Sequence, residues 1–356
     1  MPHDSSLRQL YVARLREFYR QPARLFWVYV FPTVLAVFLG AAFSRPPGDV
    51  AVDVVSTERT RAIVDQLRAY EIHKSAENRR AVALVSVSDE LARRRLASGD
   101  TPLVVVLDDV DRVTYRYDPT RPEAVIAKAI VDDDLQRLRG RRDVVATADQ
   151  KVTTPGSRYI DFLIPGLIGA NTMGGGLWGV GFLLVNFRIG KLLKRFAATP
   201  MPRRNFLLAL LGARLTFLLP DLVMLLTVGV AFFGMPIKGS LALVILVDVV
   251  GALAFAGIGL LVASRAQTIE TVSGLMNLVM LPMWLCSGVF FRADQFPWYL
   301  QPLVQALPLT HLVGALRRVM LQGAGPLDRD ILGALAILSA WAVVTFVLAL
   351  RRFRWT

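Results

Sequence analysis

Long apolar runs separated by short polar links dominate the chain. A transmembrane helix needs about 20 mainly apolar residues to cross a hydrocarbon core of about 30 Å. Runs of this kind occur at about Leu25–Phe43, Ile160–Phe187, Phe206–Phe233, Leu241–Ala263, Ile269–Phe291 and Ile331–Leu350. The pattern predicts an α-helical polytopic membrane protein with six transmembrane helices, one at residues 25–43 and five within residues 159–350.

The polar stretch at residues 44–158 has a different pattern. Short β-branched runs predict strands at Val50–Val55, Ala81–Val87, Leu103–Leu107 and Arg112–Tyr117. Helical patterns run from Thr57 to about Ile72, from an N-cap at Ser88 to Gly99, and from about Arg121 to Arg139. We expect a small extracytoplasmic α/β domain between the first and second spans.

Residues 292–322 are only partly apolar, and Pro297, Pro302 and Pro308 interrupt them. The pieces between these prolines are too short to cross the bilayer. We expect an external re-entrant or interfacial helical hairpin, with Trp298 and Tyr299 at the level of the lipid head groups.

The charge of the chain is concentrated beside the apolar runs. Lys+Arg number 41 and Asp+Glu 28, a formal charge of +13, and residues 1–24, 188–204 and 351–356 contribute +3, +6 and +3 of it. Basic residues in such positions follow the positive-inside rule. They predict a multi-pass protein of the cell membrane with cytoplasmic N- and C-termini, in contact with lipids and without a nucleic-acid partner.

The N-terminal segment, residues 1–24, shows the spacing of a cytoplasmic amphipathic helix, with Leu7, Leu10, Tyr11, Leu15 and Phe18 near helical spacing. An interfacial helix that leads into a retained first span is one interpretation. The alternative is the apolar region of a cleaved signal peptide, because Ala42-Phe43-Ser44 offers small residues to a peptidase. At the other end, residues 351–356 form a basic cytoplasmic tail.

Patterns typical of catalysis are absent from the sequence. One cysteine and three histidines exclude a cysteine-based zinc site, and no G-x-x-x-x-G-K-[ST], G-x-S-x-G or H-E-x-x-H run occurs. The acidic residues of the polar stretch, Asp108, Asp109, Asp111 and Asp132–Asp134, lack EF-hand spacing, so a solvated acidic face is favoured over a calcium site. The chain is predicted not to be an enzyme by itself and to hold no catalytic residue, metal or cofactor.

Charged residues within the spans are functional candidates because they are costly there. They are Arg214 and Asp221 in the third span and Asp248 in the fourth. One hypothesis is a proton or cation relay. The other is a buried Asp221 that bonds a neighbouring helix or the backbone freed by Pro220, with Arg214 reaching out to the cytoplasmic head groups.

Two spans carry further candidate residues. The second span is rich in glycine, and Gly175 and Gly179 form a G-x-x-x-G pair, which indicates either a subunit interface or pathway, or tight packing within one subunit. The fifth span carries a stripe of methionine, asparagine and tryptophan, in which the flexible methionines adapt to varied neighbours. The stripe is consistent with contact to a ligand or with ordinary packing between helices. Its members are Met276, Asn277, Met280, Met283 and Trp284.

The order of one span, an external α/β domain and five spans resembles the permease subunit of ABC type-2 exporters. Three stretches carry the resemblance: Tyr159–Gly166, Lys194–Pro200, and Ser287–Phe291 continuing through Leu307–Thr310 to Ala315–Arg317. In that family a basic cytoplasmic loop docks on a separate ATP-binding subunit. Two permease subunits pair with two ATPases that bind ATP and magnesium, and the second and fifth spans line the substrate path.

The resemblance assigns roles to residues of this chain. It implies an ATPase-coupling loop at residues 188–205, with Arg188, Gly190, Lys191, Lys194, Arg195, Thr199 and Pro200, and a substrate path with Asn171, Thr172, Met276, Asn277, Met280, Met283 and Trp284. Many members have an E-x-E-x-G pattern where this chain has Asn186-Phe187-Arg188-Ile189-Gly190. Docking here is therefore expected to use a basic surface.

These features predict a permease that moves an amphipathic, lipid-like or drug-like substrate by alternating access, driven by a partner ATPase, as a homo- or heterodimer of permease subunits. A non-conducting mechanotransmitter that acts through the external domain is one alternative. A membrane-embedded enzyme that uses Asp221 or His311 is another, although a hydrogen-bonded interfacial role is favoured for His311.

Overall fold

The structure is a computed structural model that describes residues 3–44, 50–76, 82–109, 112–142, 158–198 and 202–352. The chain divides into two compact units. One combines residues 1–44 with residues 152–356, and the other consists of residues 45–151. Each unit has its own hydrophobic core.

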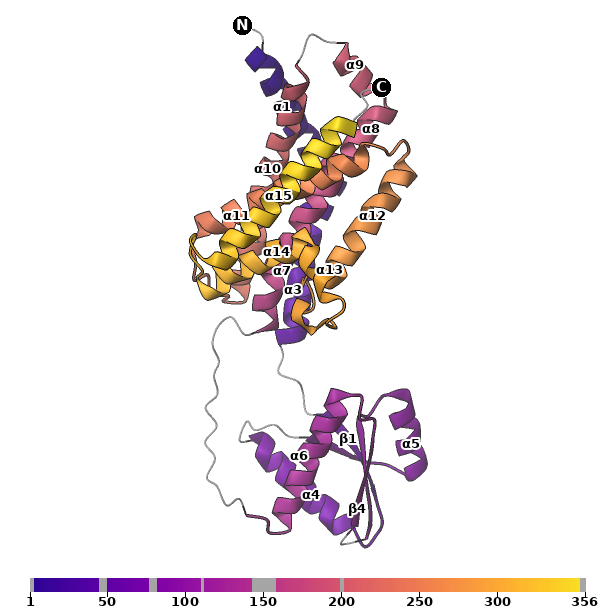
Figure 1. Cartoon of the computed structure of the whole chain (residues 1–356). Helices are drawn as coiled ribbons and strands as arrows, with labels where there is room; N and C mark the ends of the chain where they lie inside the picture. Colours follow the sequence, from indigo (N-terminus) through magenta and orange to yellow (C-terminus); the bar gives the residue numbers. More distant parts are fainter. Residues whose placement is uncertain are drawn as a thin grey trace. The chain divides into compact units, whose positions relative to one another are not determined.

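The smaller unit is built on a mixed four-stranded sheet (Figure 1). The strands are β1 (Val50–Ser56), β2 (Val82–Ser86), β3 (Leu103–Asp109) and β4 (Arg112–Tyr117), in the order β2-β1-β3-β4. Strand β1 runs parallel to β2 and β3, and β4 is antiparallel to β3. All four predicted strands are therefore present.

Helices cover both faces of this sheet. On one face α4 (Arg61–Ala76) and α6 (Pro122–Leu138) pack their apolar residues against β1 and β3. On the other face α5 (Asp89–Ser98) packs through Ala92. As predicted, the Ser88 hydroxyl caps α5 by accepting the Leu91 N–H, and Gly99 ends the helix with a φ of 82°.

The acidic residues on α6 have local partners. Tyr115 donates to Asp132, Asp133 pairs with Arg137, and Asp134 pairs with Lys74. No group of three metal-ligating side chains occurs in the described part of the chain. The side chains of Asp108, Asp109 and Asp111 lie outside that part.

Within its described residues, the larger unit holds six helices that are long and apolar enough to cross a membrane. The first span comprises α2 (Pro22–Leu25), η1 (Phe26–Val30) and α3 (Phe31–Ser44), and the second comprises α7 (Tyr159–Gly176), η2 (Leu177–Phe182) and α8 (Leu183–Ile189). The third span comprises α10 (Arg203–Thr227) and η3 (Val228–Phe232). The fourth, fifth and sixth spans are α11 (Leu241–Ala263), α12 (Ile269–Cys286) and α15 (Arg329–Arg352). The segments η1, η2 and η3 are π-helical turns, which widen a helix locally. The six predicted spans are confirmed to within a few residues.

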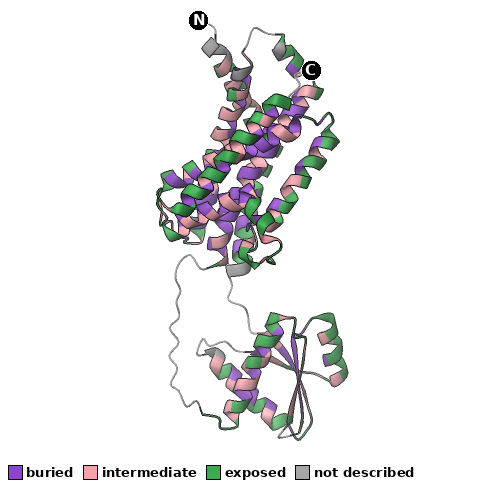
Figure 2. Cartoon of the chain, viewed as in Figure 1, coloured by how far each residue is buried: buried purple, intermediate pink, exposed green. Residues whose placement is uncertain are grey.

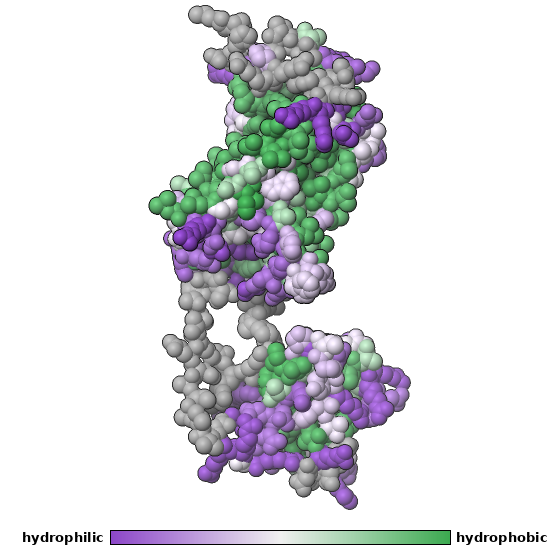
Figure 3. Space-filling view, viewed as in Figure 1, coloured by the Kyte–Doolittle hydropathy of each residue, from purple (hydrophilic) through white to green (hydrophobic). Residues whose placement is uncertain are grey.

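Burial differs strongly among the spans. Helices α7 and α11 are mostly buried at the centre of the bundle, whereas the first span, α12 and α15 leave most of their side chains exposed (Figure 2). The visible face of the larger unit is mainly hydrophobic, unlike that of the smaller unit (Figure 3). Such exposure is expected of helices that face lipid or another membrane subunit.

The interrupted segment after α12 folds as the predicted hairpin, but it packs more deeply than an interfacial position implies. It contains η4 (Ala293–Gln295), α13 (Gln301–Ala306), α14 (Pro308–Arg317) and the π-helical η5 (Arg318–Gln322). Leu312 of α14 lies against Gly251 of α11, and Val313 lies against Gly169 of α7. Trp298, before α13, is 85% exposed.

Arg317 at the end of α14 joins two distant stretches of the chain. Its guanidinium donates to the carbonyl oxygens of Phe162 and Gly288 and lies 3.4 Å from the centre of the Phe162 ring. Gly166 lies directly against the backbone of Val289. The stretches 159–166, 287–291 and 315–317 thus form one packed unit at one end of the bundle.

Candidate functional site

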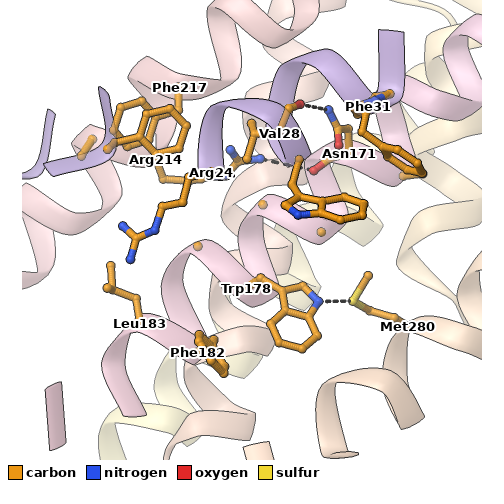
Figure 4. A pocket seen from close by; sticks show the side chains of 18 of the residues that line it. Arg24, Val28, Phe31, Asn171, Trp178, Phe182, Leu183, Arg214, Phe217 and Met280 are labelled. Atoms are coloured by element: carbon orange, nitrogen blue, oxygen red, sulfur yellow. Dashed lines mark hydrogen bonds between the residues drawn. The ribbon is translucent and has the colours of Figure 1, made fainter. Parts of the chain in front are cut away.

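A cavity of about 830 Å³ opens between four spans (Figure 4). Its walls come from the first span, from α7 with η2, from α10 and from α12, and the N-terminal helix α1 (His3–Tyr19) closes part of it. Most of the lining is apolar or aromatic, including Trp27, Phe31, Trp178, Phe182 and Phe217. A largely apolar cavity of this size is typical of small-molecule sites.

A direct contact links the second and fifth spans at the cavity. The indole N–H of Trp178 donates to the Met280 sulfur, Nε1 to Sδ, at 3.0 Å (Figure 4). Trp284, one helical turn beyond Met280, also lines the cavity. Together with Met276, which lies against Gly181, this contact holds α12 beside η2.

A polar cluster lies behind the apolar wall. The Asn171 amide donates to the Val28 carbonyl at 3.0 Å and to the Asp221 carboxylate at 2.5 Å. Next to it, the Thr172 hydroxyl donates to Asp248 at 2.6 Å. These bonds connect α7 to the first span, to α10 and to α11. Both buried carboxylates therefore have the neighbouring-helix partners that the packing hypothesis requires.

Arg214 does not reach out to the head groups, and that part of the hypothesis is wrong. The side chain is only 6% exposed. Its Nη2 points at the carbonyl oxygens of Asn171 and Thr172, at 3.4 and 3.5 Å. The guanidinium occupies the space that Gly175 leaves open: a Cβ there would lie 1.7 Å from Nη2. Arg214 therefore turns inward because α7 offers both carbonyl acceptors and a glycine gap.

The other glycines of the second span pack within this chain. A Cβ on Gly176 would lie 2.7 Å from the Phe255 backbone, and one on Gly181 would lie 2.4 Å from the Gly259 carbonyl oxygen. Gly179 faces the Arg214 stem at 3.6 Å. Of the two interpretations of the glycine-rich span, close packing inside one subunit accounts for these positions.

The N-terminal helix forms one end of the cavity, which the sequence alone did not indicate. Helix α1 packs along α10: the Phe18 and Phe217 rings stack at 3.9 Å, and the Tyr11 and Thr216 hydroxyls bond at 2.7 Å. Arg14 lies over the Phe187 ring and, with Arg24, lines the cavity. Burial lowers the pKa of Arg14, and its partner Glu17 opposes that shift.

The residues predicted for the substrate path separate into three groups. Asn171, Met280 and Trp284 line the cavity. Thr172, Met276 and Met283 are buried in contacts between helices, and Asn277 is exposed and is not part of the lining. Trp178 and Phe182, which also line the cavity, were not predicted as path residues from the sequence. Their spacing of seven and eleven residues from Asn171 places them on the same helix face.

The predicted coupling loop contains a short amphipathic helix, α9 (Leu192–Ala197). Leu193 is buried, whereas Gly190, Lys191, Lys194 and Arg195 are exposed. Lys191 takes a left-handed backbone conformation with a φ of 55°, which turns the chain between α8 and α9.

Arg188 has a different environment from the other basic residues of this loop. Its Nη1 donates to the Ala263 and Ala266 carbonyls at 2.9 and 2.8 Å. Arg188 therefore caps the end of α11 inside this chain, whereas Lys191, Lys194 and Arg195 are the exposed basic residues among the described side chains of this loop. Thr199 and Pro200 lie outside the described residues.

His311 and Asp161 have local structural partners. His311 Nε2 lies 2.7 Å from the Gln305 carbonyl oxygen, the hydrogen-bonded role favoured for it. Asp161 pairs with Arg158 at 2.9 Å at the start of α7. Neither arrangement pairs a nucleophile with a base.

A family model described as "ABC-2 family transporter protein" matches residues 23–351. The chain belongs to the ABC-2 family of transporter proteins. The match includes the first span, the smaller unit and all five later spans, so the resemblance inferred from the sequence is confirmed. This ABC-2 chain is a multi-pass membrane protein and the permease component of its transporter.

Several named proteins are similar to this ABC-2 permease. ABC transporter G family member 20 of Dictyostelium discoideum is 28% identical over 197 residues, which are 55% of this chain and 27% of that protein. The linearmycin resistance permease protein LnrN of Bacillus subtilis is 30% identical over 34% of this chain and 31% of its own length. The chain thus spans less than a third of these two relatives. The probable multidrug ABC transporter permease YbhS of Escherichia coli is 21% identical over 90% of this chain and 89% of its own length.

Proposed function

We propose that this chain is the permease subunit of an ABC exporter in the cell membrane, and that it moves amphipathic, lipid-like or drug-like substrates by alternating access. The cavity of about 830 Å³ between the first, second, third and fifth spans is the observation that carries the proposal. Its volume falls within the range of roughly 300–1,000 Å³ found for ligand pockets. Relatives named as multidrug and linearmycin resistance permeases support the same substrate class.

Movement of the cavity wall is coupled to the cytoplasmic loop through one continuous helix. The second span runs from Tyr159 to Ile189 and ends directly before Gly190 and α9. Within it, η2 is a π-helical turn that carries Trp178 and Phe182 into the cavity. An ATPase that binds α9 more tightly in one nucleotide state shifts the permease toward the matching conformation.

The same surface supports the choice of partners. Lys191, Lys194 and Arg195 are exposed around α9 and present positive charge to a partner. Two ATPase subunits, each binding ATP and magnesium, dock on the α9 segments of two permease subunits, which form a homo- or heterodimer. The N- and C-termini then lie in the cytoplasm with the docking loop, where Arg351 and Arg352 end α15.

Affinity purification tests this docking. The tagged chain is extracted in mild detergent from its native cell, and the eluate is assayed for a P-loop subunit that hydrolyses ATP. The double substitution Lys194→Glu/Arg195→Glu should abolish co-elution, since it reverses the charge of the exposed face of α9. Arg351→Glu/Arg352→Glu, an equal charge change at the other cytoplasmic end, should retain it. Co-elution that survives the α9 reversal, or that fails for both variants, contradicts docking at α9.

A mechanotransmitter is the second candidate, because residues 45–151 form a compact unit of their own with a separate core. In that case deletion of residues 45–151 abolishes function, while substitutions in the cavity have no effect. The transport proposal predicts the opposite sensitivity to cavity substitutions. The hydrogen bonds of Asp221 and His311 give both residues structural roles, so the embedded enzyme is not carried forward.

A further inference from the structure

The charged groups that line the cavity all have the same sign. Among the described residues that line it, three are arginines, Arg14, Arg24 and Arg214, and none is acidic. Positive charge therefore borders a mostly apolar space.

Two of the three arginines lie where α1 meets the first span. Arg14 and Arg24 both pair with the single carboxylate of Glu17, at 2.5 and 3.4 Å. Two cations that share one anion leave one positive charge over. Each guanidinium has five N–H donors, so donors remain available after these pairs. The side chain of Arg14 is only 14% exposed, and charged hydrogen bonds are stronger in such desolvated positions.

An apolar track leads away from these two arginines. Arg24 and Leu35 lie on one continuous helix, 35 − 24 = 11 residues apart, which corresponds to roughly 16 Å along its axis. Trp27 and Phe31 line the cavity between them, and Leu167 of α7 lines it as well. The cavity therefore combines a cationic end with an elongated apolar body.

We infer that the cavity binds anionic amphiphiles. Arg14 and Arg24 hold a carboxylate or phosphate head group, and the alkyl or aromatic body of the ligand lies along Trp27, Phe31 and Leu35. This inference narrows the substrate class of the proposed function and rests on that function for transport, whereas the binding step is measurable on the chain itself.

The binding test uses three dodecyl probes with an anionic, a zwitterionic and a cationic head group, and one anion without a tail: dodecyl phosphate, dodecyl phosphocholine, dodecyltrimethylammonium and inorganic phosphate. A terminal bromine on each alkyl probe quenches nearby tryptophans, and Trp27, Trp178 and Trp284 line the cavity. The purified full chain in a non-ionic detergent should bind dodecyl phosphate most tightly. Equal affinity for all three alkyl probes overturns the inference. The affinity for inorganic phosphate is measured by its competition with dodecyl phosphate, and an affinity equal to that of dodecyl phosphate also overturns the inference.

A matched pair of substitutions tests the assigned arginines. Arg24→Gln should weaken dodecyl phosphate binding about tenfold, the effect of one charged hydrogen bond. Arg20→Gln removes the same charge from an exposed position nearby that is not part of the lining, and should leave binding unchanged. Arg24→Glu should reverse the preference toward dodecyltrimethylammonium. Equal effects of Arg24→Gln and Arg20→Gln contradict the inference.

Two further measurements are made. The first asks whether the ligand is a bilayer lipid, and the second distinguishes failure of the binding inference from failure of the exporter proposal. Displacement of the probe by phosphatidylglycerol but not by phosphatidylcholine supports the inference with bilayer lipid as the ligand, whereas equal displacement by both contradicts it. ATP-driven transport of dodecyltrimethylammonium as fast as dodecyl phosphate refutes the inference and leaves the exporter proposal intact. Selective binding of dodecyl phosphate without ATP-driven transport of any probe refutes the exporter proposal and supports the inference.

Discussion

Gly175→Ala tests the placement of Arg214 in the cavity wall. The new methyl group would lie 1.7 Å from Nη2 and 1.9 Å from Cζ of Arg214. The backbone of α7 is held by packing on α11, so the flexible arginine must move instead. Its guanidinium then leaves the Asn171 and Thr172 carbonyls in an apolar setting. Gly174→Ala is the matched control, because its methyl group would meet only the Met280 methyl, at 3.9 Å.

The expected difference between these two variants follows from that geometry. Replacing glycine by alanine within a helix gains about 0.5–1 kcal/mol at either position, so this gain cancels in the comparison. The loss of hydrogen bonds made by a charged donor costs about 1.5–3 kcal/mol. Gly175→Ala should therefore be less stable than Gly174→Ala by about 1.5–3 kcal/mol, and Gly174→Ala should equal or exceed the parent chain.

The assay is the free energy of unfolding in mixed micelles, measured for both variants with and without Arg214→Met. Methionine keeps much of the arginine stem but removes the guanidinium. In that background the two alanine variants should have equal stability, because the group that clashes is gone. A Gly175→Ala variant as stable as Gly174→Ala would refute the assigned position of Arg214. A deficit that persists with Arg214→Met would assign the cost to another contact.

Two predictions concern groups outside the cavity. Arg317→Leu leaves the Phe162 and Gly288 carbonyls without their donor, so unfolding in detergent should show a loss of about 2–4 kcal/mol. Arg318→Leu breaks a half-exposed pair with Asp330 and should lose no more than about 1 kcal/mol; equal losses would contradict the role of Arg317. In the smaller unit, burial, reinforced by a hydrogen bond with Asp134, raises the pKa of Glu71 to about 7 from its usual 4.5. The folded unit then holds this proton more tightly than the unfolded chain, so its stability is greatest below about pH 4.5 and falls as the pH rises through about 7. Hydrogen exchange in β1 and β2, corrected for intrinsic rates, should show more protection at pH 5 than at pH 8, and Glu71→Gln should remove the difference. A difference that remains would assign the pH dependence to another group.

The sequence predicted the spans and the smaller unit because strong physical constraints act on single segments. A span must be apolar over about 20 residues, and each strand of the sheet shows its β-branched run, as at Val50–Ser56. Helix α5 was bounded correctly because Ser88 and Gly99 act locally as its caps. These features need no knowledge of which segments pack together.

The cavity depends on pairings between distant segments, and the sequence showed it only in part. In the sequence, Arg14 and Arg24 are only two of the basic residues that follow the positive-inside rule. Their contact with the cavity depends on how α1 packs along α10. Arg214 was expected to point outward because the gap at Gly175 lies on another helix. The π-helical turn η2, which carries Trp178, has no marker in its apolar sequence. Met276 and Met283 share the stripe of Met280 but face packed neighbours.

Transport through the cavity is tested most directly by ATP-driven uptake of an amphipathic dye into inside-out proteoliposomes that hold the permease with its ATPase. Met280→Trp places a bulkier side chain in the cavity beside η2, and Val343→Trp places the same side chain on the exposed face of α15. We expect Met280→Trp to abolish uptake while the ATPase stays bound and active, and Val343→Trp to transport at the parent rate. Parent-rate uptake by Met280→Trp would contradict a substrate path through this cavity.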